Sequence, residues 1–185
     1  MSATAVFERI IAALERARIP HMLTGSFAGS YHGSPRATQD IDLVIEADEA
    51  CLRALIASMP RAEYYVDEDA ALEALRAETQ FNVIDLATGW KVDLIIRKSR
   101  PFSREEFARR SVTEFEGAKL SIASVEDVIL SKLEWAKSGA SSRQIEDVAS
   151  ILKIRGGDLD GAYLERWIES LGIRQEWNAA RKRAL

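Results

Sequence analysis

The segment at residues 40–45, DIDLVI, is the feature that most constrains how this chain can fold. Its apolar residues predict a buried β-strand, yet Asp40 and Asp42 lie within it. Side chains of a strand alternate between two faces, so the two carboxylates share one face about 7 Å apart. Carboxylates this close in a partly buried place repel each other and stay ionised only when cations lie between them. The segment therefore predicts a core strand that binds a hard divalent cation such as Mg²⁺.

The composition is that of an ordinary globular protein. The chain has 185 residues, of which 47% are hydrophobic and 29% charged, so we expect one domain or a core with a helical appendix. The single cysteine, Cys51, excludes an internal disulfide and a cysteine-rich zinc site. The net charge of −4 argues against a surface that binds nucleic acid all over, although residues 97–110 are locally basic. Without a signal-peptide pattern or a run of ~20 apolar residues, we expect a cytoplasmic protein with no membrane contact.

Helical and strand patterns alternate up to residue 123, and helices alone are expected after it. Ser124 with Asp127, and Ser141 with Gln144, have the spacing of capping boxes that begin two of the later helices. Strands are expected at residues 21–24, 40–45, 64–66, 81–86, 91–96, 112–115 and 118–122, the last four forming two hairpins that turn at residues 87–89 and at Glu116-Gly117. We therefore predict an α/β (α+β) fold, in which residues 1–123 form a mixed β-sheet core with flanking helices and residues 124–185 form a C-terminal helical region packed on it.

A third carboxylate and a phosphate-binding pattern accompany the aspartate pair. Asp93 lies in a second apolar strand, KVDLII, and if the two strands are neighbours the three carboxylates converge as in a two-metal site. Gly25-Ser26 follows a strand and begins a helix, where free backbone N–H groups and the helix dipole favour anions. Arg36 and Thr38, on the loop before the first aspartate, offer further ligands for phosphate oxygens. Together these residues predict a site for a polyphosphate and divalent cations.

Lys132 falls inside the apolar stripe of the helix that follows Ser124, so it faces the core. Its ammonium group either reaches an edge of the protein or meets a buried acid or a bound phosphate. Arg143 and Asp147 lie four residues apart on the next helix. They are either an ordinary surface pair or groups that orient Lys132 or the metal ions.

These motifs resemble those of the nucleotidyltransferase superfamily with the DNA polymerase β type of fold, in which a Gly-Ser pair is followed by an Asp-x-Asp strand and a later aspartate. Within it, the chain is most similar to the AbiEii-type toxins and the minimal nucleotidyltransferases. The first motif is carried by Gly25-Ser26-x-Ala28 and Arg36-x-Thr38-x-Asp40-Ile41-Asp42, the second by Asp93, the third by Lys132-x-x-x-Ala136 and the fourth by Arg143 to Asp147, where Glu146 replaces a lysine of the family.

The resemblance implies an enzyme that transfers NMP from an NTP to an acceptor hydroxyl and releases pyrophosphate. Two Mg²⁺ ions, or Mn²⁺ in their place, would be bound by three aspartates, which with Lys132 are the catalytic residues: Asp40, Asp42 and Asp93. The nucleotide would be bound by Gly25, Ser26, Arg36, Thr38, Lys132 and Asp147. The acceptor is the 3′ end of RNA or tRNA, a protein or a small molecule. The protein is either a stand-alone enzyme or part of a toxin–antitoxin pair with a cognate protein partner.

Two other functions remain open from the sequence. A protein of the same fold that has lost turnover, such as an antitoxin or an NTP sensor, would bind NTP with Mg²⁺ and release no pyrophosphate. A phosphoesterase or a kinase could use the same metals, and a kinase would transfer the γ-phosphate and leave NDP. The phosphate bond that breaks distinguishes these functions.

Overall fold

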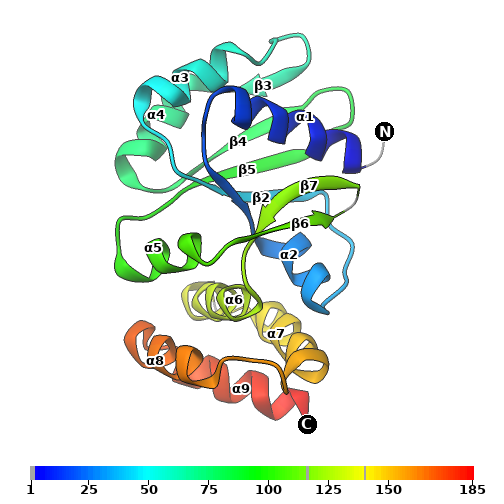
Figure 1. Cartoon of the computed structure of the whole chain (residues 1–185), viewed down its shortest axis with the longest axis vertical. Coiled ribbons are helices and arrows are strands. Elements are labelled where there is room, and N and C mark those ends of the chain that lie inside the picture. The colour runs from blue at the N-terminus through cyan, green and yellow to red at the C-terminus, as the bar shows by residue number, and fades with distance from the viewer. Residues whose placement is uncertain (1–2, 116, 140) are drawn as a thin grey trace.

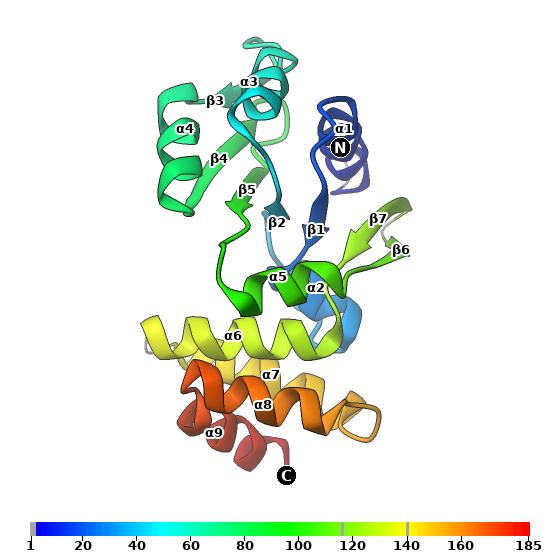
Figure 2. The ribbon, with the colours of Figure 1, turned by 60° about the vertical axis from the view of Figure 1, so that its left-hand side comes forward.

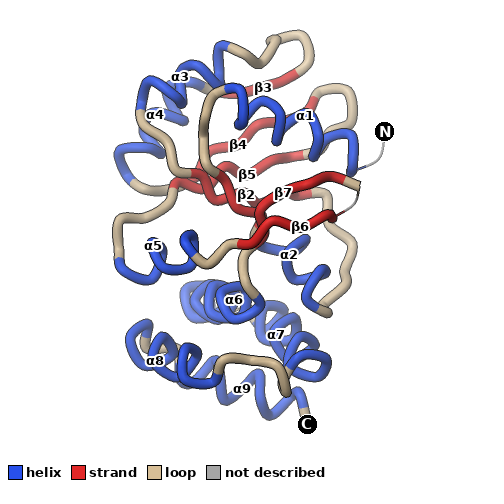
Figure 3. The backbone as a smooth tube through the Cα atoms, in the orientation of Figure 1, coloured by secondary structure: helices blue, strands red, loops and turns tan. Residues whose placement is uncertain are grey.

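The computed structural model describes residues 3–115, 117–139 and 141–185, which form a mixed β-sheet with helices on both faces (Figure 1, Figure 3). The strands are β1 His21–Leu23, β2 Asp40–Ile45, β3 Tyr64–Val66, β4 Gln80–Asp85, β5 Lys91–Ile96, β6 Ser111–Phe115 and β7 Ala118–Ile122. The helices are α1 Ala3–Arg16, α2 Gly25–His32, α3 Glu49–Ala57, α4 Glu68–Ala77, α5 Pro101–Ala108, α6 Val125–Gly139, α7 Ser142–Arg155, α8 Gly161–Leu171 and α9 Arg174–Ala184. The predicted α/β fold with a mixed sheet is confirmed.

The strands are arranged in the order β3-β4-β5-β2-β1-β7-β6. At the centre, β2 pairs with β5 in parallel and with β1 in antiparallel orientation. The hairpins β4–β5 and β6–β7 extend the sheet toward its edges, and β1 joins β7 in parallel. The parallel pair of β2 and β5 therefore places two distant segments of the sequence side by side.

Different helices cover the two faces of the sheet. Helices α1, α3 and α4 lie on one face, and α2, α5 and the C-terminal helices lie on the other (Figure 1). The view turned by 60° shows α6 to α9 stacked beneath the sheet, with α6 nearest to it (Figure 2). The hydroxyl of Tyr163 in α8 donates a buried hydrogen bond of 2.5 Å to Asp127 in α6. This bond fixes α8 against the helix that carries Lys132.

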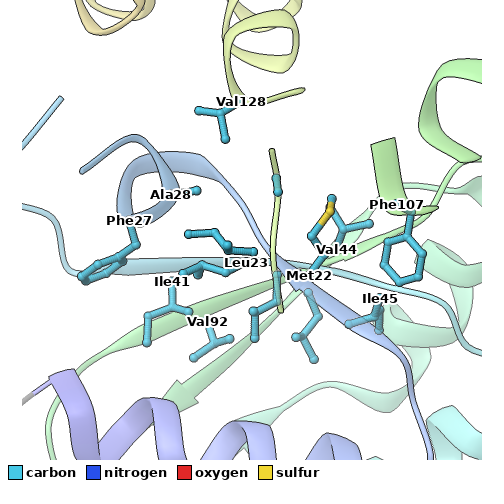
Figure 4. Close-up of a cluster of buried hydrophobic side chains, with 14 of the residues drawn as sticks. Met22, Leu23, Phe27, Ala28, Ile41, Val44, Ile45, Val92, Phe107 and Val128 are labelled. Atoms are coloured by element: carbon cyan, nitrogen blue, oxygen red, sulfur yellow. The ribbon is translucent and has the colours of Figure 1, made fainter. Parts of the chain in front are cut away.

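The apolar face of β2 explains why this strand lies at the centre of the sheet. Ile41, Leu43 and Ile45 alternate along it and are fully buried. Figure 4 shows Ile41 and Ile45 in the same cluster as Met22 of β1 and Val92 of β5. Full burial of an aliphatic side chain stabilises a fold by about 1.5–3 kcal/mol. One face of β2 thus holds the strand in place while the other carries its two aspartates.

Most predicted elements are confirmed within a few residues, and some details differ. The basic segment 97–110 contains a helix that was not predicted, α5, which begins with a proline at a position where its missing N–H costs nothing. Ser124 accepts a hydrogen bond from the Asp127 backbone N–H (3.2 Å), as a capping box predicts, but Ser141 makes no side-chain cap within the described residues. Glu116, in the second hairpin turn, lies outside the described residues.

The helical C-terminal part begins where the sequence pattern changes. Strand β7 ends at Ile122, and only helices follow from Val125 within the described ranges. The division into a core and an appended helical region at residue 123 stays a prediction. None of the helices in the described part of the chain is both long and apolar enough to span a bilayer.

Candidate active site

Asp42 and Asp93 lie directly opposite each other on the central pair of parallel strands. Strands β2 and β5 are in register at these two residues, and opposed side chains of parallel strands point to the same face. Asp40 is two residues earlier on β2, so it shares this face. Asp93 is buried (6% exposed), Asp42 is half-buried and Asp40 is exposed. The condition for convergence, that the two aspartate strands are neighbours, is therefore met.

The N-terminus of α2 meets the carboxylate of Asp42. Gly25 has a φ of +63°, in the left-handed region that other residues rarely adopt. A Cβ atom there would overlap the Asp42 carboxylate and come within 2.8 Å of the Asp42 Cβ. The backbone N–H of Ser26 donates a hydrogen bond to this carboxylate, and the Thr24 N–H donates to the Asp42 carbonyl (2.9 Å). Glycine is required because helix and strand approach each other this closely.

The surroundings of Asp42 disfavour its charge. Burial, then the carboxylate of Asp93 and more weakly that of Asp40, raise the pKa of Asp42 to about 6, although the Ser26 N–H and the Lys132 ammonium oppose the change. Asp93 Oδ1 is buried and accepts no hydrogen bond from any described residue. A cation between Asp42 and Asp93 would relieve the repulsion and give this oxygen a partner. The pair therefore fits a divalent metal ion.

Lys91, at the start of β5, lies between the carboxylates of Asp40 and Asp93. Its ammonium is 3.0 Å from Asp93 Oδ2 and 3.7 Å from Asp40 Oδ1, and the hydrogen bond to Asp93 raises the pKa of Lys91. No group of three or more His, Cys, Asp or Glu side chains in the described residues is arranged to hold a metal ion. The three aspartates share one face of the sheet as expected, but only Asp42 and Asp93 are directly opposed, and the ammonium of Lys91 lies between Asp40 and Asp93.

The predicted phosphate-binding side chains are joined in one network around Asp147. Lys132 is buried (4% exposed), and its ammonium donates to Asp147 Oδ2 (2.7 Å) and to Gln144 Oε1 (3.3 Å). Arg36 Nε lies 3.3 Å from the same Asp147 oxygen, and Arg36 Nη2 donates to the Ser26 hydroxyl. Burial lowers the pKa of Lys132, and Asp147 opposes this effect. Of the two outcomes that the sequence left open, Lys132 meets a buried acid.

Two residues of the predicted set have other contacts. The Thr38 hydroxyl accepts a hydrogen bond from the Asp40 backbone N–H (3.1 Å), so Thr38 shapes the start of β2. Arg143 is exposed, and no ion pair joins it to Asp147 within the described residues, since Asp147 binds Lys132 and Arg36 instead. Of the two alternatives that the sequence left open, the surface pair is not formed among the described residues, whereas Asp147 does orient Lys132.

The carboxylates and the Asp147 network meet at one cavity of about 220 Å³. Gly25, Ser26 and Arg36 line it together with the three aspartates and Lys132. Oxygen ligands for cations and cationic donors for phosphate thus lie in the same space, which is what a metal-bound polyphosphate requires.

Solved structures resemble this fold over nearly its whole length, whereas no protein-family model and no curated protein sequence matches the chain. They include an antigenic nucleotidyltransferase-like protein from Paracoccidioides brasiliensis (16% identity, 98% of this chain and 93% of that chain, TM-score 0.59). The antibiotic-resistance factor ANT(2'')-Ia is similar both in solution (14% identity, 97% and 95%, TM-score 0.53) and in complex with adenylyl-2''-tobramycin (15% identity, 99% and 97%, TM-score 0.50). The chain has the nucleotidyltransferase fold.

The nucleotidyltransferase fold confirms the wider resemblance seen in the sequence. Identities of 16% or less carry the fold alone, so the narrower likeness to AbiEii-type toxins stays a prediction. Within this nucleotidyltransferase fold, the cavity contains residues that the sequence did not reveal: Gln80, Ser131, Trp135 and Gln144. Gly29 of α2 leaves room for the Lys132 side chain, since a Cβ at Gly29 would lie 3.0 Å from Lys132 Cε. This glycine is the sequence signal that agrees with the inward position of Lys132.

Proposed function

We propose that this protein is a nucleotidyltransferase that transfers NMP from an NTP to an acceptor hydroxyl and releases pyrophosphate. The observation that carries the proposal is the opposed pair of Asp42 and Asp93 beside the Gly25 helix terminus, in one cavity with Lys132 and Arg36. A kinase or a phosphoesterase could use similar carboxylates, so the test must identify the phosphate bond that breaks.

The cationic side of the cavity suits a triphosphate. Lys132 has three N–H donors, of which Asp147 and Gln144 accept two. Two cations, Lys132 and Arg36, share the single carboxylate of Asp147, so the group of three carries a net positive charge. The Ser26 hydroxyl already accepts from Arg36, and its own proton is free to turn toward a phosphate oxygen. These residues bind and orient the β- and γ-phosphates in the proposed reaction.

The acidic side would hold two divalent cations, Mg²⁺ or Mn²⁺, through Asp42 and Asp93, and Asp40 would join them if Lys91 moved away. When bound, such ions activate the attacking oxygen and neutralise the charge that develops on the leaving group. The acceptor oxygen attacks the α-phosphorus, the bond to the β-phosphate oxygen breaks, and pyrophosphate leaves. In the proposed reaction the acceptor hydroxyl gives up its proton to the Asp93 carboxylate.

Three classes of acceptor are candidates. ANT(2'')-Ia has been solved with adenylyl-2''-tobramycin, which makes a small molecule a candidate acceptor beside an RNA 3′ end and a protein. A role in a toxin–antitoxin pair, with a cognate protein partner, would follow from the narrower resemblance to AbiEii-type toxins. The cytoplasm is the expected location in every case, because the substrate NTP is found there.

A second candidate function is favoured by Lys91. An ammonium that already lies 3.0 Å from Asp93 Oδ2 takes the position of a cation, as expected in a binding module that has lost turnover. Such a module would bind NTP and release no pyrophosphate, and its binding would not depend on Mg²⁺ if Lys91 takes the place of the metal ion.

The experiment is to measure ATP binding with Mg²⁺ and with EDTA, and pyrophosphate release with each NTP in the presence of a cell extract. The transferase should bind ATP more tightly with Mg²⁺ and release pyrophosphate, and Asp42→Asn should abolish release. The control is Asp69→Asn, which makes the same change at an exposed residue of α4. Binding of ATP without any pyrophosphate release, whether or not it depends on Mg²⁺, would contradict the transferase and support the binding module.

A further inference from the structure

A second cavity of about 240 Å³ continues the candidate active site along the same face of the sheet. Val44 and Ile95, each two residues beyond an aspartate, line this second cavity, so the face that carries Asp42 and Asp93 forms a continuous floor. Thr24, Ser131 and Trp135 line both cavities, as does Ile95. Each cavity alone is smaller than the roughly 300 Å³ at which small-molecule sites begin. Two adjoining compartments suit a reaction with two substrates.

Glu106 is a buried carboxyl group in this second cavity. It lies on α5 and is 8% exposed. Its Oε2 accepts a hydrogen bond from the Ser131 hydroxyl (3.0 Å), which is its only hydrogen bond from a described residue. Arg100, one of the cations that line the cavity, is bound by Glu134 (Nη2 to Oε2, 2.6 Å). Glu106 therefore keeps unused acceptor capacity where a ligand can reach it.

The charges around Glu106 set what it can bind. Burial raises the pKa of Glu106 to about 7, the carboxylates of Asp127 and Glu134 add to this effect, and Ser131 and Arg100 oppose it. A hydroxyl or an ammonium group that donated to Glu106 would supply the stabilisation that the ionised carboxylate lacks.

A nucleic acid suits this cavity less well. Its phosphates would approach the carboxylates of Glu106 and Glu134. Of the cations that line the cavity, Arg97 and Arg100 are already paired with Glu46 and Glu134, and the exposed Lys98 is in no ion pair with a described residue. Trp135 is 59% exposed and offers an aromatic face against which a small ring can pack at the junction of the two cavities. The charges and the volume favour a small acceptor that carries hydrogen-bond donors.

We propose that the second cavity is the acceptor subsite, and that Glu106 selects a small acceptor molecule by binding one of its amino or hydroxyl groups. This inference rests on the proposed nucleotidyl transfer and deepens it. A donor group held by Glu106 on α5 would anchor one end of the acceptor, and a second hydroxyl would extend past Trp135 toward Asp93.

The test is a calorimetric titration that needs no turnover, with Mg²⁺ and α,β-methylene-ATP present throughout. Tobramycin serves as an amino sugar, maltose as a neutral sugar and a short single-stranded RNA as the nucleic acid. The proteins are the wild type, Glu106→Gln and the matched control Glu105→Gln, which makes the same change one residue earlier at a site outside the cavity. Glutamine keeps the volume of Glu106 and can still accept from Ser131, so the variant should fold.

We expect a sugar to bind the wild type and Glu105→Gln equally and Glu106→Gln at least tenfold more weakly. A larger loss for tobramycin would identify an ammonium ligand, and a larger loss for maltose a hydroxyl. Equal affinity of all three proteins, no binding of either sugar, or binding of RNA alone would overturn the subsite. If pyrophosphate is released equally by the wild type and Glu106→Gln, the proposed acceptor subsite is wrong while the proposed nucleotidyl transfer stands. Sugar binding that depends on Glu106 without any release would reject the transferase alone.

Discussion

Replacing Asp42 by asparagine is predicted to stabilise the metal-free protein while it abolishes activity. Burial and the neighbouring carboxylates raise the pKa of Asp42 from 3.8 to about 6. Because the pKa is higher in the folded state than in the unfolded state, protonation favours folding, and this contribution is lost as the pH rises through about 6. One pKa unit corresponds to about 1.4 kcal/mol, so at pH 8 the ionised carboxylate costs the fold up to about 3 kcal/mol. Its partial exposure reduces this to about 1–2 kcal/mol.

The assay is thermal unfolding at pH 8 in EDTA. For a chain of this length, 1–2 kcal/mol corresponds to a rise in Tm of about 3–6 °C. The gain should nearly disappear at pH 3, below both the unfolded pKa of 3.8 and the folded pKa of about 6, because Asp42 is then mostly protonated in both states. Mg²⁺ should stabilise the wild type but not the variant.

The contrasting variant is Asp85→Asn on β4. Although Asp85 is buried, hydrogen bonds from Thr88 and Arg9 lower its pKa. This change should therefore reduce the Tm at pH 8. If Asp42→Asn also reduced the Tm without metal, the Asp42 carboxylate would be a structural group and the electrostatic reasoning would be refuted.

Three further predictions concern the rest of the site. Gly25→Ala should abolish activity because its Cβ displaces the Asp42 carboxylate. The control Gly89→Ala, at another positive φ (+74°) with open space around it, should keep activity and cost only about 1–2 kcal/mol of stability. Equal loss of activity in both variants would contradict the steric argument. Lys132→Met should raise the KM for NTP at least tenfold in steady-state assays, whereas Lys137→Met, on the exposed side of α6, should leave the KM unchanged. An unaltered KM in Lys132→Met would show that Lys132 contacts only buried acids and not the nucleotide. The pKa of Glu106 is raised to about 7, so the wild type should lose stability as the pH rises through 7, whereas Glu106→Gln should not. Parallel curves of Tm against pH for the two proteins would show that ionisation of Glu106 does not destabilise the fold.

The spacing of apolar residues along the chain was enough to predict the main strands and helices. The strand at 40–45 alternates apolar and acidic residues, and only one face of it can enter the core. An aspartate in such a strand is costly unless it binds something, which is why Asp42 and Asp93 were identified from the sequence alone. Lys132 was identified for the same reason, as a cation in an apolar stripe.

The unpredicted residues depend on contacts between distant segments. Lys91 is an ordinary residue at the start of a strand, and only the register of β2 with β5 places it next to Asp40. Gln144 was interpreted as part of a helix cap, but it accepts a hydrogen bond from Lys132 instead. Glu106 lies on a helix within a basic segment, where local charge gives no sign of a buried carboxyl. The four-residue spacing of Arg143 and Asp147 allowed an ion pair along α7, but the Asp147 carboxylate contacts Lys132 and Arg36 from other helices and loops instead.

The most direct test of nucleotidyl transfer follows the fate of each phosphate. The protein is incubated with Mg²⁺, an acceptor mixture of small molecules, RNA and protein, and ATP labelled either at the α- or at the γ-phosphate. The account predicts that the α-label becomes attached to an acceptor, that the γ-label leaves as pyrophosphate, and that Asp42→Asn does neither. Transfer of the γ-label to an acceptor, with ADP as the other product, would contradict it.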